Sequence, residues 1–313
     1  MADALSLLCA ELFAALPRKD QRRRGTEYVE GLLRTPGRKS IRNIGGRAGE
    51  QRLHHFVSDS TWDWAPVRRA LRRHLLLAAP PQAWVLRSMI IPKAGAHSVG
   101  VARRFCTTRG ASLNAQHAVG VWAATIGRAV PVGWRLHLDA PTDPRALGEC
   151  LAEAYLEHAD GDHALPVVVD ARGADAAGLI GRLRAAGAPV LARVDPGTAL
   201  WSATPLPGYG HGPLPAARLI RIDPHRRRRA VRLDGHDLTL LDEGWLTDVA
   251  GRTPDPAALL DRVDADLETL GERAGLRDFT GRSFAGWHRH ITLASAAHAL
   301  LALNGVTYRA DAA

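Results

Sequence analysis

The sequence has no long hydrophobic runs and is poor in cysteine. None of its apolar stretches reaches the roughly 20 residues that a membrane-spanning helix needs, and its N-terminal stretch contains Asp and Glu, which argues against a secretion signal. The three cysteines, Cys9, Cys106 and Cys150, lie far apart and lack the spacing of a metal site. An odd number of widely separated cysteines excludes a disulfide framework and predicts a protein of the reducing cytoplasm.

Several motifs that mark common enzyme classes are also missing. No glycine-rich loop follows a predicted strand to hold a phosphate, no cysteine or histidine spacing is typical of zinc, and no Gly-x-Ser-x-Gly segment could form a nucleophile elbow. The sequence therefore predicts neither a bound cofactor nor a resident metal ion.

The positive charge is carried almost entirely by arginine. Lysine occurs only at Lys19, Lys39 and Lys93 among 41 basic residues, against 32 acidic ones, and the net charge is +9. A basic protein can bind nucleic acid by neutralising phosphates and releasing counterions. A GC-rich coding sequence, however, produces the same excess of arginine, alanine and glycine without selection for DNA. Charge alone therefore leaves nucleic-acid binding open.

The first 80 residues predict a helical segment. Apolar residues recur at helical spacing over 5–16 and again over 28–33, and Pro17 separates the two runs. Two further helices are predicted over 52–79, because apolar residues there again recur at helical spacing. The remaining residues, 81–313, are enough for one large core domain.

That core is predicted to be a mixed sheet flanked by helices. Four β-rich runs of suitable length for an antiparallel meander lie at 83–91, 97–106, 117–127 and 131–138. Helices and buried strands then alternate, as in a parallel α/β layer, at 144–159, 167–171, 176–187 and 189–194. The fold class is therefore predicted to be α/β.

The last third of the sequence contains fewer clear signals. Proline and glycine are dense at 203–217, which predicts a surface loop or mobile insertion. A strand pair is predicted around 217–241, and helices at 256–274 and 284–303 complete the core.

Five segments in a fixed order resemble the DDE transposases of bacterial insertion sequences. They are HHFVSDSTWDW (54–64), IPKAGAHSVGVARRFC (91–106), PVGWRLHL (131–138), VVVDARGAD (167–175) and GLRDFTGRSFAGWHRHITL (275–293). The resemblance implies an RNase H-like catalytic core. It also implies a reaction in which three carboxylates hold two divalent ions, which activate a water or a 3′-hydroxyl for DNA strand cleavage and transfer.

The resemblance breaks at the first of these carboxylates. Where the family has an Asp-Asp-Thr type of motif, this sequence has Arg87, Ser88 and Met89. Residues 80–100 contain no Asp or Glu, so a small shift of the alignment does not restore the acid. Arginine stays positively charged, and it therefore replaces a metal ligand with a fixed cation. We expect that two-metal strand transfer has been lost.

The other two acids of the family have matches here. The second is Asp170, and the third is Asp264 by an ungapped count, with Glu268 one turn later as the other candidate. The leading hypothesis is a repurposed, metal-independent enzyme that acts on a small molecule in the ancestral cleft. Its candidate catalytic residues are Arg87, Asp170 and Asp264, and its candidate substrate-binding residues are Ser88, Arg172, Glu268, His97 and His288. Structural roles for the Arg87–Asp170 pair and for the two histidines are the competing interpretations.

The alternative hypothesis is a catalytically inactive relative that binds DNA, as a regulator or remnant of a mobile element. Its candidate contacts are Arg22, Arg23, Arg24, Arg38, Lys39, Arg226, Arg227, Arg228 and Arg229. Runs of arginine are more often solvated loops, and the N-terminal helices carry no clear helix-turn-helix signature. A chain that folds without retaining any function is the third explanation.

Overall fold

The computed structural model describes residues 2–106, 110–138, 143–158, 164–223, 227–251 and 254–310. The predicted helices near the N-terminus are present as α1 (Ala2–Phe13), α2 (Lys19–Arg34), α3 (Ile41–His54) and α4 (Ala65–Ala78). Helix α3 begins earlier than predicted because Ser40 caps it, accepting a hydrogen bond from the amide of Asn43. A π-helical turn, His55–Asp59, then leads toward α4.

The N-terminal helices share one hydrophobic core with the rest of the chain. Helix α2 packs against the last helix, α10 (Phe284–Ala310), and α1 packs against α2 and α4. The buried side chains of Leu12, Tyr28 and Leu53 belong to the same apolar cluster as Val85 in the sheet. Burial of this continuous apolar surface holds the helical segment against the core.

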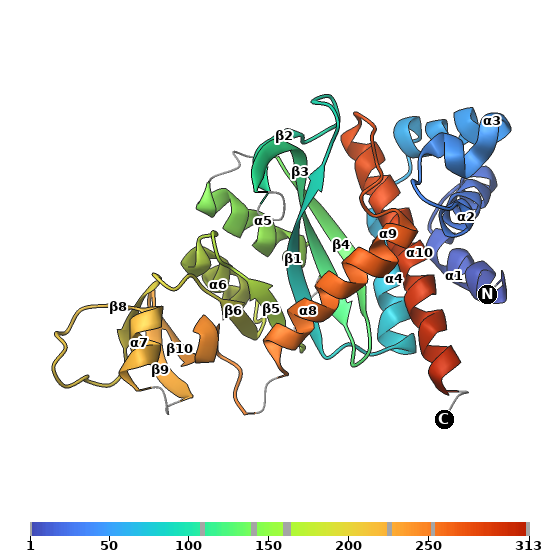
Figure 1. Ribbon diagram of the computed structural model, residues 1–313. Coiled ribbons are helices and arrows are strands. Elements are labelled where there is room, and N and C mark those ends of the chain that lie inside the picture. The colour runs from blue at the N-terminus through green and yellow to red at the C-terminus, as the bar shows by residue number, and fades with distance from the viewer. Residues whose placement is uncertain are drawn as a thin grey trace.

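The strands form one mixed sheet (Figure 1). In chain order they are β1 (Ala83–Pro92), β2 (Ala102–Cys106), β3 (Ala111–Ala124), β4 (Ala129–His137), β5 (Val167–Asp170), β6 (Val190–Arg193), β7 (Ala199–Ser202), β8 (Leu214–Pro215), β9 (Arg228–Leu233), β10 (His236–Leu241) and β11 (Trp245–Thr247). The spatial order is β2-β3-β1-β5-β6-β11-β10-β9-β7-β8, and β4 also pairs with β3.

The centre of this sheet has the arrangement of an RNase H-like fold. Strands β1, β3 and β4 are antiparallel neighbours, whereas β5 runs parallel to β1 and β6 runs parallel to β5. The side chains of Val167, Val168 and Val169 are fully buried, as expected for a strand covered on both faces. The predicted α/β fold class is therefore confirmed.

Helices cover the central strands. Helix α5 (Pro144–Leu156) packs against β1, β3 and β4, and α6 (Ala176–Ala185) packs against β6. Helix α8 (Pro256–Asp266) lies across β1, β4 and β5, and it is followed by a π-helical turn (Leu267–Gly271) and the short helix α9 (Glu272–Ala274) (Figure 1). None of the helices in the described ranges combines the length and apolar character needed to cross a bilayer.

Three sequence predictions are corrected by the structure. The predicted strand pair at 217–241 begins instead with a helix, α7 (Ala216–Ile222), because Ala216 and Leu219 bury one face at helical spacing. Only the second half of the run at 97–106 forms a strand, since Gly100 has a φ of 70°, outside extended backbone. The loop predicted at 203–217 contains β8 and the start of α7.

Candidate active site

Three elements bring the predicted catalytic residues together. Arg87 lies in the middle of β1, Asp170 ends β5, and Asp264 projects from α8. The parallel register of β1 and β5 pairs Leu86 with Val169, so Arg87 and Asp170 come next along their neighbouring strands. Because α8 crosses both strands, Asp264 contacts Arg87 although it lies 177 positions later in the sequence.

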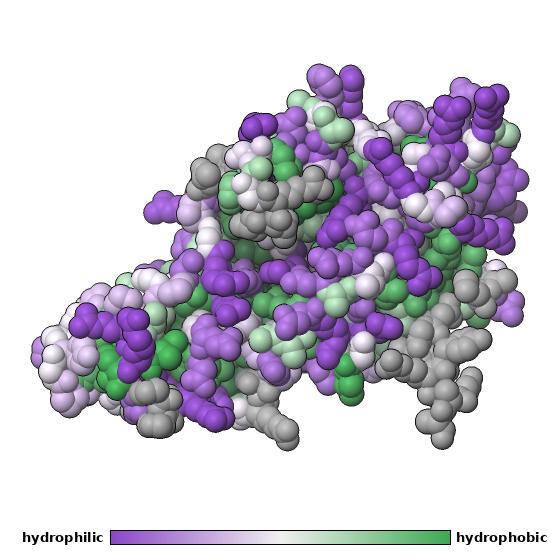
Figure 2. All heavy atoms as spheres, viewed as in Figure 1, coloured by the Kyte–Doolittle hydropathy of each residue, from purple (hydrophilic) through white to green (hydrophobic). Residues whose placement is uncertain are grey.

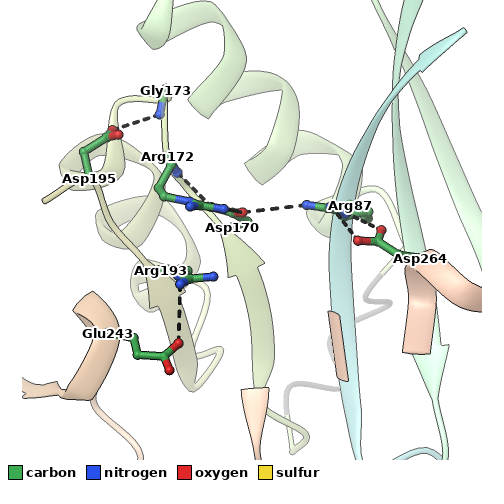
Figure 3. Close-up of polar contacts among 8 residues, drawn as sticks. All are labelled: Arg87, Asp170, Arg172, Gly173, Arg193, Asp195, Glu243 and Asp264. Carbon is green, nitrogen blue, oxygen red and sulfur yellow. Dashed lines mark hydrogen bonds and ion pairs between the residues drawn. The ribbon is translucent and has the colours of Figure 1, made fainter. Parts of the chain in front are cut away.

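Four charged side chains lie in a row with alternating sign where these elements meet (Figure 3). In order they are Arg172, Asp170, Arg87 and Asp264. Arg87 binds Asp264 through two hydrogen bonds, Nε to Oδ1 and Nη2 to Oδ2, both 2.7 Å long. Arg172 binds Asp170 in the same two-pronged way, at 2.8 and 2.6 Å. An ion pair of 3.7 Å between Nη1 of Arg87 and Oδ2 of Asp170 links the two pairs. Such bidentate bonds are among the strongest between protein side chains.

The surroundings of Asp170 keep it ionised. Its side chain is 12% exposed, and this burial by itself would raise the pKa. The hydrogen bonds and charge of Arg172, together with the charge of Arg87, outweigh burial and hold the pKa below its usual range. A carboxylate whose pKa is lowered in this way is a weak base, which counts against a catalytic role of Asp170 as a proton acceptor.

Further polar contacts fix the loop that follows β5. Asp195 accepts a hydrogen bond of 2.9 Å from the backbone amide of Gly173, directly after Arg172. On the next strand, Arg193 pairs with Glu243 at 3.4 Å, so paired charges continue along this edge of the site (Figure 3). The backbone next to Arg172 is therefore held by a hydrogen bond of its own, which helps to fix the two hydrogen bonds between Arg172 and Asp170.

Local sequence explains why α8 presents Asp264. Asp255 caps the helix by accepting hydrogen bonds from the amides of Ala257 and Ala258, and Pro256 suits the first turn. The apolar residues Leu259, Leu260 and Val263 are buried, which leaves Asp264 at the edge of the buried face.

A groove of about 1020 Å³ opens beside Arg87 and Asp264. One wall follows β1 and its continuation from Arg87 to Gly95, and the other comes from α8, α9 and the segment after α9. Charged residues of both signs line it: Arg38, Arg87, Lys93 and Arg277, and Asp264, Glu268, Glu272 and Asp278. Figure 2 shows hydrophilic side chains gathered on this face over α8 and α9. The groove is therefore a polar cleft without excess charge of either sign.

A comparison with protein-family models finds one match. The model described as DDE superfamily endonuclease matches residues 11–238. The chain belongs to the DDE superfamily endonuclease family. The matched residues include Arg87 and Asp170 but end in β10, before the helix that carries Asp264. No curated protein matches this DDE family member.

Two of the five predicted substrate-binding residues of this DDE family member line the groove, whereas Arg172 and the catalytic candidate Asp170 are not among the residues that line it. Ser88 and Glu268 line the groove, and Glu268 lies in the π-helical turn after α8. Arg172 lies beside Asp170. His97 is exposed and is not among the residues that line the groove.

His288 lies at a different pocket. It stacks on Trp64 with ring centroids 4.7 Å apart, and its Nδ1 is 3.0 Å from a guanidinium nitrogen of Arg68. This pocket, of about 380 Å³, is lined by β4, α5 and the start of α10. His290 has separate partners, the hydroxyl of Tyr28 and the carbonyl oxygen of Gly275, each at 2.9 Å. His288 and His290 therefore do not share a site.

The candidate DNA contacts do not form one surface. Arg22 and Arg23 are exposed on α2, whereas Arg24 pairs with Glu27. Arg226 lies outside the described residues. Arg227 and Arg228 are exposed, but Arg229 is 4% exposed within β9. Helix α2 and strand β9 lie at opposite ends of the molecule (Figure 1).

Sequence reasoning missed part of the groove. Lys93, Arg277 and Asp278 belong to segments that were used only as evidence of resemblance, and no role was assigned to them. Arg38 was considered only as a DNA contact. The signal available in the sequence was the presence of a lysine directly after the apolar run of β1, because a strand end commonly faces a site in α/β proteins.

Proposed function

We propose that this DDE family member does not transfer DNA strands with two metal ions and instead acts without a metal on a small molecule in the groove. The observation that carries the proposal is the place of Arg87. Its guanidinium lies between Asp170 and Asp264, within ion-pair distance of both. A divalent ion bound by these two carboxylates would have to occupy the same point.

The residues present do not fit a site for two divalent ions. Divalent ions such as Mg²⁺ need negatively charged oxygen ligands, and here Asp170 and Asp264 are neutralised by Arg172 and Arg87, for a sum of zero. A cation about 4 Å from Arg87 would be repelled by roughly 4 kcal/mol per unit charge at an effective dielectric constant of 20, less where solvent screens it. Within the described ranges, no three His, Cys, Asp or Glu residues are grouped to hold a metal ion.

The groove supports a small-molecule ligand. Its volume of about 1020 Å³ lies at the upper end of the range for ligand pockets, roughly 300–1,000 Å³. Two of its charge pairs are internal, Arg87 with Asp264 and Arg277 with Glu272. Arg38 and Glu268 remain exposed on the groove with no ion pair among the described residues, so both signs are available to orient a ligand.

Metal titration tests the first half of the proposal. We expect no saturable heat when Mn²⁺ or Mg²⁺ is added to the wild-type protein in a calorimeter. The Arg87→Asp variant changes the local sum of charges from zero to −2 and should gain saturable Mn²⁺ binding. Arg232→Asp is the matched control, because it reverses the same charge at an exposed pair with Asp237 and should gain nothing. Tight wild-type binding that Asp170→Ala abolishes would overturn the proposal.

A shift assay with duplex DNA tests the alternative that the chain binds DNA. Small-molecule action predicts weak binding, because helix α2, which carries Arg22 and Arg23, and strand β9, which begins with Arg228, lie at opposite ends of the molecule (Figure 1). A steep dependence on salt together with a sequence preference would favour the DNA-binding alternative instead.

A further inference from the structure

Lys93 holds an unusual position at the end of the groove. It directly follows β1 and lines the groove, and its backbone amide donates to the carbonyl of Asn114 at 2.8 Å. Its Nζ donates to two backbone carbonyls, that of Arg277 at 2.9 Å and that of Phe279 at 2.6 Å. No carboxylate of the described residues forms an ion pair with it.

This geometry leaves one tetrahedral position of the nitrogen for a ligand. An ammonium has three N–H donors, and a neutral amine has two N–H donors and a lone pair. The carbonyls of Arg277 and Phe279 use two donors in either state. The third position is therefore an N–H in the charged form and a lone pair in the neutral form, and no described group occupies it.

Proton transfer fits these contacts better than a covalent imine. Gain or loss of a proton at Nζ keeps both hydrogen bonds to the carbonyls. Formation of an imine would leave at most one hydrogen on Nζ, in the protonated form, and at least one of the carbonyls of Arg277 and Phe279 would lose its donor. A buried acceptor that loses its donor costs about 1–3 kcal/mol.

The electrostatic surroundings favour a neutral amine. Burial, opposed by the charge of Asp278 and assisted by the charge of Arg38, lowers the pKa of Lys93 to about 8. A base works best when its pKa lies near the working pH. Lysines whose charge is poorly solvated are used in this way at catalytic sites.

We infer that Lys93 is the group that exchanges a proton with the small molecule bound in the groove. This role rests on the proposed function, since it needs a ligand in that groove. The lone pair of Nζ forms the new N–H bond, and the electron pair of the broken bond stays on the substrate. The resulting ammonium and the guanidinium of Arg38, which line the same groove, then face the negative charge left behind.

Site-resolved acetylation tests the role on the whole protein. The chain has only three lysines, so trace acetic anhydride followed by mass spectrometry reports each one separately. We expect the labelling of Lys93 to be half-maximal near pH 8, and exposed Lys19 serves as the internal reference. At pH 8 about half of Lys93 is then neutral, roughly 100-fold more than for a lysine with a pKa near 10.4.

Two variants sharpen this test. Arg38→Ala removes a charge that lowers the pKa of Lys93 and should move the midpoint upward, whereas Arg42→Ala on the exposed side of α3 should leave it unchanged. A midpoint above pH 10, or no labelling of Lys93 while Lys19 reacts fully, refutes the inference. Metal titration of the same sample reports on the proposed function separately, because labelling of Lys93 involves no metal.

Discussion

Buried histidines make this protein sensitive to acid, and four of them have a pKa well below its usual value. Burial lowers the pKa of His117 to about 3, of His288 to about 2, and of His290 and His298 to about 4, from 6.5. All four side chains are buried. The folded protein therefore holds them neutral, whereas the unfolded chain protonates them as the pH falls below about 6.5.

The size of the effect follows from these shifts. A histidine with a pKa of 6.5 in the unfolded chain and about 4 in the folded protein loses about 2 kcal/mol of stability between pH 7.5 and pH 5. Four such residues together lose about 8 kcal/mol, which is comparable to the whole stability of a typical domain, about 5–15 kcal/mol. We expect the stability to be complete above about pH 7 and to collapse as the pH falls toward 5.

One variant tests the contribution of a single histidine. His298 contacts Trp122, and its buried Nδ1 has no hydrogen-bond partner among the described residues, so none of them accepts a second proton from the ring. His298→Leu removes this titration. The difference in free energy of unfolding between pH 7.5 and pH 5, measured with urea, should therefore shrink by about 2 kcal/mol.

His97→Leu is the matched control for this experiment, because His97 is exposed. It should leave the pH dependence unchanged. If His298→Leu and wild type show the same dependence on pH, the reasoning from burial is wrong.

Two further variants test the packing around the site. Arg68 donates from α4 to Thr292, to the carbonyl of Trp134 and to His288. Arg68→Met leaves these buried acceptors without their donor and should lower the free energy of unfolding by about 1–3 kcal/mol, whereas exposed Arg69→Met should change it little. A loss below 1 kcal/mol in urea denaturation would contradict this. Asp255→Ala removes the cap of α8 and should lower the free energy of unfolding by about 1 kcal/mol by the same measurement. Asp261 is exposed on the same helix, so Asp261→Ala controls for the lost charge. Equal losses of stability in the two variants would refute the capping role.

Much of the fold could be predicted because the local patterns are strong. The apolar runs of β1 and β5 and the helical spacing of α1, α2 and α6 all lie where the sequence placed them. Helix α7 was missed because a seven-residue helix beside proline and glycine gives little periodic signal. The early start of β3 was missed because its first residues are exposed and carry no apolar alternation.

Some features of the site could likewise be predicted from local sequence, whereas others depend on contacts between distant segments. The residues alone show that an arginine, Arg87, stands where the resemblance places the family's first acid, and that Asp170 follows an apolar run typical of a buried strand. The packing of the chain adds that Arg87 binds Asp264, that Arg172 binds Asp170, and that Lys93 donates to two carbonyls from the segment after α9. Residue type and strand position are local properties, whereas each partner is chosen by how α8 and the chain after it pack across the sheet.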